Sequence, residues 1–101
     1  MERLDEILAV PGIDVVVIAS FDLSMAMGVP GRFDDPDLLR SVAEAEAKVK
    51  KVGLPLGGVA LTADAAKAKR AAGYRLLLVG FDILLVDAAA RAAVASVTAP
   101  P

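Results

Sequence analysis

Three continuous apolar runs alternate with helix-like patterns along this chain. The runs are Asp14–Ala19, Pro55–Leu61 and Tyr74–Val79, and each is short and lacks apolar–polar alternation. Continuous runs of this kind are typical of parallel strands that are covered on both faces. We therefore predict an α/β fold with three parallel strands in βαβαβα order, joined by right-handed crossovers.

The clearest helix signal lies between the first two runs. Asp35 can cap a helix whose first position is Pro36, and Gly53 suits the position just after its end. Apolar residues at steps of three and four give this helix one core-facing stripe. The ion pairs that this spacing predicts on its solvent face are Glu44–Lys48 and Glu46–Lys50.

Three further helices are predicted with weaker signals. A short helix over residues 2–9 opens the chain, one runs from a Thr62 cap to Gly73, and one covers residues 83–95 with Asp82 as its cap. Residues 98–101 are predicted to form a frayed tail. The basic residues predicted on the solvent face of the Thr62 helix are Lys67, Lys69 and Arg70.

The helices predicted in this chain are too few to cover both faces of a three-stranded parallel sheet. The predicted helices suffice for one face, and the other face would expose alternate aliphatic side chains of all three strands. Each such side chain left in water forfeits about 1.5–3 kcal/mol, against a typical stability of about 5–15 kcal/mol. We infer that a segment outside these residues covers the second face.

Composition fits one domain over residues 1–101, because 56% of the residues are hydrophobic and 24% are charged. The chain has no histidine and no cysteine. The usual proton shuttle at neutral pH and the soft ligands of zinc are therefore missing, and any bound metal would be a hard cation held by oxygen.

Charge and hydropathy exclude two classes of partner. Eleven basic and thirteen acidic residues give a net charge of −2, with no basic stripe that could follow a phosphate backbone. No apolar run reaches the ~18 residues of a membrane span, and the acidic start lacks the basic region of a signal peptide. We expect a cytoplasmic protein that binds neither nucleic acid nor membrane.

Two stretches near the N-terminus resemble the HpcH/HpaI family of class II pyruvate aldolases. They are Glu6–Ala19, which includes Val10-Pro11-Gly12-Ile13-Asp14, and Phe21-Asp22-Leu23-Ser24-Met25-Ala26-Met27-Gly28. The resemblance continues at Gly31, Pro36-Asp37, Gly57-Gly58-Val59 and Val79-Gly80-Phe81-Asp82. Members of this family cleave 2-keto-3-deoxy sugar acids and related hydroxy-oxo acids to pyruvate and an aldehyde.

The resemblance implies a partial (β/α)8 TIM barrel. A complete barrel needs about 250 residues, so the chain would be a C-terminal portion that contains the last three βα units. The open face of its sheet would then line the barrel interior. This implies a complementing barrel segment as partner, or a homo-oligomer, with a small 2-oxo acid as substrate.

The resemblance also implies a metal and substrate site at Asp22. In the family, the aspartate of the Asp-Leu-Ser motif ligates a divalent ion, which would be Mg²⁺, Mn²⁺ or Co²⁺, and the ion holds pyruvate and stabilises its enolate. The backbone amides at Phe21 and Asp22 would bind the substrate carboxylate. Phe21 stands where the family usually has alanine, which places a ring beside the pyruvate position.

No catalytic residue is assigned within the chain. The family's second metal ligand, a glutamate, and its catalytic arginine and histidine would lie upstream of Met1. We therefore predict a fragment of a metal-dependent aldolase, a carbon–carbon lyase, that is inactive in isolation. The alternatives are a small non-catalytic α/β module that binds an anion or a partner, and an element that self-associates through its apolar edges.

Several residues have a structural reading beside the functional one. Asp22 could be a turn residue, and Asp34, Asp35 and Asp37 are predicted to serve capping rather than calcium binding. Gly57-Gly58 could admit substrate or only make room for packing. Gly80 could offer its amide to an anion, although plain helix entry is the favoured reading. Met25 and Met27 are predicted to fill an irregular gap.

Overall fold

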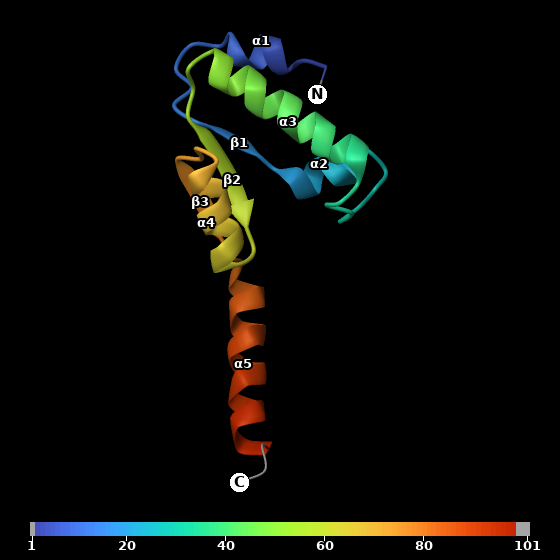
Figure 1. The fold of residues 1–101 in the computed structure, drawn as a ribbon, viewed down its shortest axis with the longest axis vertical. Coiled ribbons are helices and arrows are strands. Elements are labelled where there is room, and N and C mark those ends of the chain that lie inside the picture. The colour runs from blue at the N-terminus through green and yellow to red at the C-terminus, as the bar shows by residue number, and fades with distance from the viewer. Residues whose placement is uncertain (1, 99–101) are drawn as a thin grey trace.

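Three short parallel strands form the centre of the computed structural model, which describes residues 2–98, and helices alternate with them (Figure 1). The sheet order is β1-β2-β3, and both neighbouring pairs are parallel. The predicted α/β fold is therefore confirmed. The elements are α1 (Leu4–Leu8), β1 (Val16–Ile18), α2 (Ser20–Ala26), α3 (Pro36–Lys51), β2 (Leu56–Ala60), α4 (Ala63–Ala71), β3 (Leu76–Val79) and α5 (Asp82–Thr98).

The capping signals in the sequence define the ends of α3 and the start of α4. Oδ1 of Asp35 accepts hydrogen bonds from the amides of Asp37 at 3.0 Å and Leu38 at 3.2 Å. Gly53 follows α3 with a φ of 77°, a conformation that glycine adopts without strain. Oγ1 of Thr62 accepts from the amide of Ala65 at 3.2 Å. The predicted caps of both helices are confirmed.

The predicted bounds of α1, β2 and β3 are each longer than those observed, and β1, α2 and α5 differ in further ways. β1 spans Val16–Ile18 rather than residues 14–19, because the chain turns into α2 directly after it. The helix α2 was not predicted, since seven residues are too few to show a helical period. Asp82 is the first residue of α5 rather than a cap before it, and α5 continues to Thr98, which was predicted in the frayed tail. Residues 99–101 of that tail lie outside the described residues.

One face of the sheet is buried beneath α3 and α4. Val49 and Ala45 of α3 pack in a buried cluster with Leu56 of β2 and Ile18 of β1. On this face, a Cβ added at Gly58 would lie 2.6 Å from Cε1 of Tyr74. Glycine is therefore needed at this position to let the tyrosine ring pack against the strand.

The opposite face of the sheet is apolar and open. The register aligns Val17, Gly57 and Leu76 in one row across the three strands, with Leu78 on the same face of β3. Val17, Leu76 and Leu78 are 39%, 41% and 49% exposed. A Cβ added at Gly57 would lie 2.8 Å from Cγ2 of Val17, so this glycine also serves packing. The prediction of an uncovered apolar face is confirmed.

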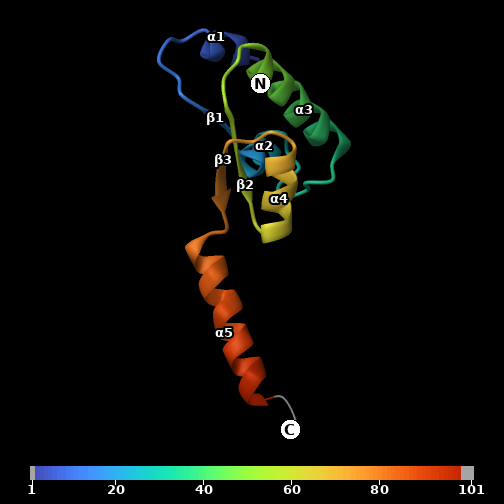
Figure 2. The ribbon, with the colours of Figure 1, turned by 60° about the vertical axis from the view of Figure 1, so that its left-hand side comes forward.

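The helix α5 extends away from the sheet in both views (Figures 1 and 2). Gly80 has a φ of 71° and donates its amide to the carbonyl of Ala60 at 2.8 Å. Only Gly80 and Phe81 separate β3 from α5. Every residue of α5 is exposed, including Ile83 at 73% and Val97 at 84%. This helix therefore buries none of the sheet. Among the described residues, no helix combines the length and apolar character needed to cross a membrane.

Tertiary partners replace the predicted ion pairs on α3. Nζ of Lys48 lies 2.6 Å from Oδ2 of Asp5, and Nζ of Lys50 donates to the carbonyl of Ala72 at 3.3 Å. The carboxylate of Glu46 accepts a hydrogen bond from the hydroxyl of Tyr74. The predicted pairs were wrong because these side chains reach other elements, which local spacing does not show.

Tyr74 links the start of β3 to α3 and α4. The side chain is buried, its hydroxyl donates to Glu46, and Nζ of Lys69 lies 4.5 Å from the ring centroid. Burial raises the pKa of Tyr74 well above its usual range, and the hydrogen bond to Glu46 and the charge of that carboxylate raise it further. Lys69 was predicted on a solvated face and instead packs over this ring.

The Glu46→Gln substitution is expected to lower the pKa of Tyr74 while leaving it raised, because burial remains after the negative charge is removed. Tyr74 is the only tyrosine and the chain has no tryptophan, so a tyrosinate absorbance titration reports this residue alone. The exposed Glu44→Gln variant is the control. An unchanged midpoint in Glu46→Gln would contradict the hydrogen bond.

The raised pKa also predicts how stability depends on pH. The folded chain holds the tyrosine proton more tightly than the unfolded chain does. The resulting stabilisation is complete below the unfolded pKa of about 10 and is lost as the pH rises through the folded value. Urea unfolding at increasing alkaline pH measures this loss, which should be smaller in Glu46→Gln.

Two adjacent leucines of α3 test which side of the helix is core. Leu38 is 1% exposed and Leu39 is 53% exposed. The Leu38→Ala substitution should reduce the free energy of unfolding by about 2–5 kcal/mol, whereas Leu39→Ala should change it by no more than about 0.5 kcal/mol. Equal effects in urea unfolding would show that the helix is rotated from its described position.

Candidate functional site

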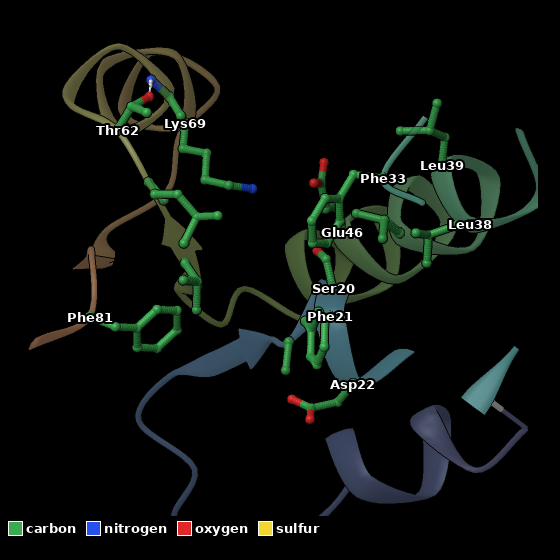
Figure 3. A pocket seen from close by; sticks show the side chains of 16 residues that line it. Ser20, Phe21, Asp22, Phe33, Leu38, Leu39, Glu46, Thr62, Lys69 and Phe81 are labelled. Carbon is green, nitrogen blue, oxygen red and sulfur yellow. Dashed lines mark hydrogen bonds between the residues drawn. The ribbon is translucent and has the colours of Figure 1, made fainter. Parts of the chain in front are cut away.

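A cavity of about 640 Å³ opens at the C-terminal edge of the sheet, between α3 and α4 (Figure 3). Residues that directly follow each strand border it: 19–22 after β1, Leu61 and Thr62 after β2, and Phe81 after β3. Parallel α/β proteins place their active sites at this edge, because the loops after the strands converge there. The position of the cavity therefore marks it as the candidate site.

The cavity walls are mainly apolar, with a few charged groups. Figure 3 shows Lys69 extending from α4 toward the side where Glu46 stands on α3. Small-molecule sites are commonly apolar clefts in which a few polar groups fix the orientation of the ligand. The apolar lining residues include Phe21, Phe33, Leu38, Leu39, Val42 and Ala65.

Phe21 and Asp22, the residues to which the family resemblance assigns substrate binding, both line this cavity. They lie in the first turn of α2, immediately beyond β1, and both side chains are exposed. The ring of Phe21 lies against that of Phe33, with centroids 6.4 Å apart. The sharp turn from β1 into α2 brings the aspartate and the aromatic pair to one edge of the sheet.

A divalent cation is not fully accommodated by the described residues alone. Asp22 offers the oxygen that Mg²⁺ and similar ions prefer. Within residues 2–98, however, no three histidine, cysteine, aspartate or glutamate side chains gather in a group that could hold a metal. One carboxylate is too few to hold such an ion tightly, so further ligands would have to come from elsewhere.

Two other candidate features have structural roles. Asp35 caps α3 as predicted, whereas Oδ1 of Asp37 lies 3.0 Å from Nη2 of Arg40 and forms an ion pair within the helix rather than a cap. The amide of Gly80 donates to Ala60 within the sheet. Gly80 therefore serves the exit from β3, and its N–H is not directed to an anion.

Four residues at or behind this cavity were not identified from the sequence. The helical pattern predicts an ion pair with Lys50 for Glu46 and a solvent-exposed position for Lys69, and Phe33 lies in a loop without periodicity. Ser24 was noted only as part of the Asp-Leu-Ser motif, yet it is the buried polar side chain of the described core. The Asp-Leu-Ser motif could have indicated a role for Ser24, whereas no local sequence pattern indicates that Glu46, Lys69 and Phe33 lie at the cavity.

The chain matches the family model described as HpcH/HpaI aldolase/citrate lyase over residues 1–89. It is 30% identical over 92 residues to a hydroxypyruvate/pyruvate aldolase of Sagittula stellata, covering 91% of this chain and 36% of the relative. It is 34% identical over 85 residues to a 2-keto-3-deoxy-L-rhamnonate aldolase of Escherichia coli, covering 84% of this chain and 32% of that relative.

A solved structure shares the arrangement of strands and helices. It is an HpcH/HpaI aldolase/citrate lyase family protein from Burkholderia cenocepacia, with a TM-score of 0.86 and 32% sequence identity. The similarity covers 95% of this chain and 37% of that structure. The chain thus spans only about a third of the length of the relatives that it matches.

The matching HpcH/HpaI family structure is a TIM barrel, so the three strands and their helices have the architecture of part of a (β/α)8 barrel. This agrees with the open apolar face, because barrel strands bury one face in the barrel interior and the other beneath helices. The family match extends over most of the residues. The chain belongs to the HpcH/HpaI aldolase/citrate lyase family.

Proposed function

We propose that this chain contributes part of the active site of an aldolase that reversibly cleaves a 2-oxo-hydroxy acid to pyruvate and an aldehyde. The observation that carries the proposal is the position of Asp22, which borders the cavity at the C-terminal edge of the sheet. The aldolase relatives support the same reaction class. Because the chain spans about a third of their length, the activity belongs to a larger assembly.

The amides of Phe21 and Asp22 are proposed to bind the carboxylate of the oxo acid. The first hydrogen bond across the α2 turn joins the amide of Leu23 to the carbonyl of Ala19 at 3.0 Å. No side chain caps this helix at Ala19. The amides ahead of Leu23 therefore stand outside the helical ladder and have donor capacity for a ligand.

Asp22 is proposed to share a divalent cation, Mg²⁺, Mn²⁺ or Co²⁺, with an acidic group donated from outside this chain. A carboxylate is the appropriate ligand for such hard cations. The remaining ligands of the cation would be supplied by the other strands of the complete barrel. The isolated chain is accordingly proposed to be inactive, although Asp22 already borders the cavity.

The proposed partner is a complementing barrel segment or a second copy of the chain, since residues 1–101 are proposed to form one partial domain equivalent to the last three βα units. The open sheet face and α5 both expose large apolar side chains. Burial of each such side chain is worth about 1.5–3 kcal/mol. Covering these two surfaces would therefore provide a substantial driving force for association.

A second candidate function is a non-catalytic α/β module that binds a small anion or a partner. The mainly apolar cavity, with Lys69 among its lining residues, would also suit a small anion without any catalysis. The two candidates differ in the role of Asp22, because only the aldolase requires its carboxylate.

A chimera tests the aldolase proposal directly. Residues 1–98 would replace the matching segment of the Sagittula stellata aldolase, which supplies the missing part of the barrel. We expect pyruvate release from a hydroxy-oxo acid with Mn²⁺, and a loss of more than about 100-fold in activity and Mn²⁺ affinity in Asp22→Asn. The exposed Asp34→Asn variant is the matched control. A folded chimera in which Asp22→Asn remains fully active would refute the role of Asp22.

The mass of the chain in solution tests the association proposal. Sedimentation equilibrium of the 10.4 kDa chain should show a dimer or a larger species, because the apolar surfaces of the sheet and α5 are otherwise exposed to water. Replacing Val97, which is 84% exposed and the most exposed large apolar residue within positions 2–98, by lysine should shift the distribution toward smaller species. A monodisperse monomer of the original chain would favour the independent module instead.

A further inference from the structure

Ser24 occupies an unusual position for a polar side chain, because it is 0% exposed and lies two residues after Asp22 on α2. Its hydroxyl donates to the carbonyl of Phe21 at 2.6 Å and accepts from the amide of Gly31 at 2.9 Å. A buried hydroxyl is costly unless it is hydrogen-bonded. Here the single hydroxyl joins the first turn of α2 to the following loop.

The bond to Phe21 acts on a specific peptide group. The Phe21 carbonyl and the Asp22 amide belong to the same peptide, which is planar, so fixing the oxygen also fixes the direction of the N–H. A hydrogen bond donated to the carbonyl polarises the peptide and strengthens its N–H as a donor. The hydroxyl of Ser24 therefore adds to the restraint that α2 places on the orientation of the Asp22 amide and increases its donor strength.

The bond from Gly31 acts on the cavity wall. Gly31 has a φ of 71°, and a Cβ built on it would lie 4.0 Å from Cε2 of Phe21. Two residues further along the loop, Phe33 packs its ring beside that of Phe21 at an interplanar angle of 48°. The hydroxyl of Ser24 thus holds the loop in the position that forms this aromatic wall.

We propose that Ser24 is a positioning residue for the oxo-acid carboxylate: its buried hydroxyl holds the Phe21–Asp22 peptide and the loop at Gly31 in the geometry that receives the substrate. This inference rests on the proposed function, because it concerns the same amides. Ser24 itself does not contact the substrate.

The kinetic test uses the active chimera with Ser24→Ala and Ser24→Cys, which remove the strong hydrogen bonds at small and nearly equal volume. Each variant should raise the KM for the oxo acid about tenfold, with a smaller change in kcat, because an amide that binds the carboxylate is misoriented. Ser24→Thr, which retains the hydroxyl, should restore most of the KM. The control is Ser96→Ala, since Ser96 donates to the carbonyl of Ala93 in the same way on exposed α5.

Nuclear magnetic resonance of the 101-residue chain gives a readout that does not depend on activity. The amide signal of Asp22 should shift in Ser24→Ala, and the amide of Gly31 should exchange with solvent faster; both should be unchanged in Ser96→Ala. An unmoved Asp22 amide, or an unchanged KM in folded Ser24→Ala, would overturn the positioning role. Loss of activity in Ser24→Ala alongside full activity in Asp22→Asn would instead refute the proposed function of Asp22.

Discussion

The structure depends on a sheet that is buried on one face and open on the other. Leu56 and Ile18 pack beneath α3, while Val17, Leu76 and Leu78 on the opposite face meet solvent. Two helices can cover only one side of three parallel strands. The helix that follows β3, α5, covers neither face, because it extends beyond the edge of the sheet (Figure 2). Burial of this apolar face would require contact with further protein. The partial coverage of the relatives is consistent with that requirement.

The same parallel arrangement creates the candidate site. All three strands run in one direction, so the residues after β1, β2 and β3 meet at one edge, where Asp22, Thr62 and Phe81 border a single cavity. The abrupt transition from Ile18 to α2 brings the Asp22 amide and carboxylate to this edge together. Each segment needs to contribute only a few residues to such a site, because the parallel strands bring the segments that follow them to the same edge of the sheet.

Phe21 makes one wall of the cavity aromatic. Its ring packs beside Phe33 and makes the wall next to Asp22 apolar and bulky. The amide of Gly31 donates a hydrogen bond to the buried hydroxyl of Ser24 behind this wall. The aromatic pair and its support form one structural unit, in which Phe21 lines the cavity and the hydrogen-bonded groups of Ser24 and Gly31 lie outside its lining.

The sequence by itself determined the three strands, the order of the main helices and the caps at Asp35 and Thr62, because these depend on contacts within a few residues. It also indicated the open face, since composition and strand number suffice for that inference. Only the tertiary structure decided the partners of Lys48, Glu46 and Lys69, the existence of α2, and the bridge from Ser24 to Gly31. These features join segments that are distant in sequence or too short to show a period, so their energies depend on packing that no local pattern encodes.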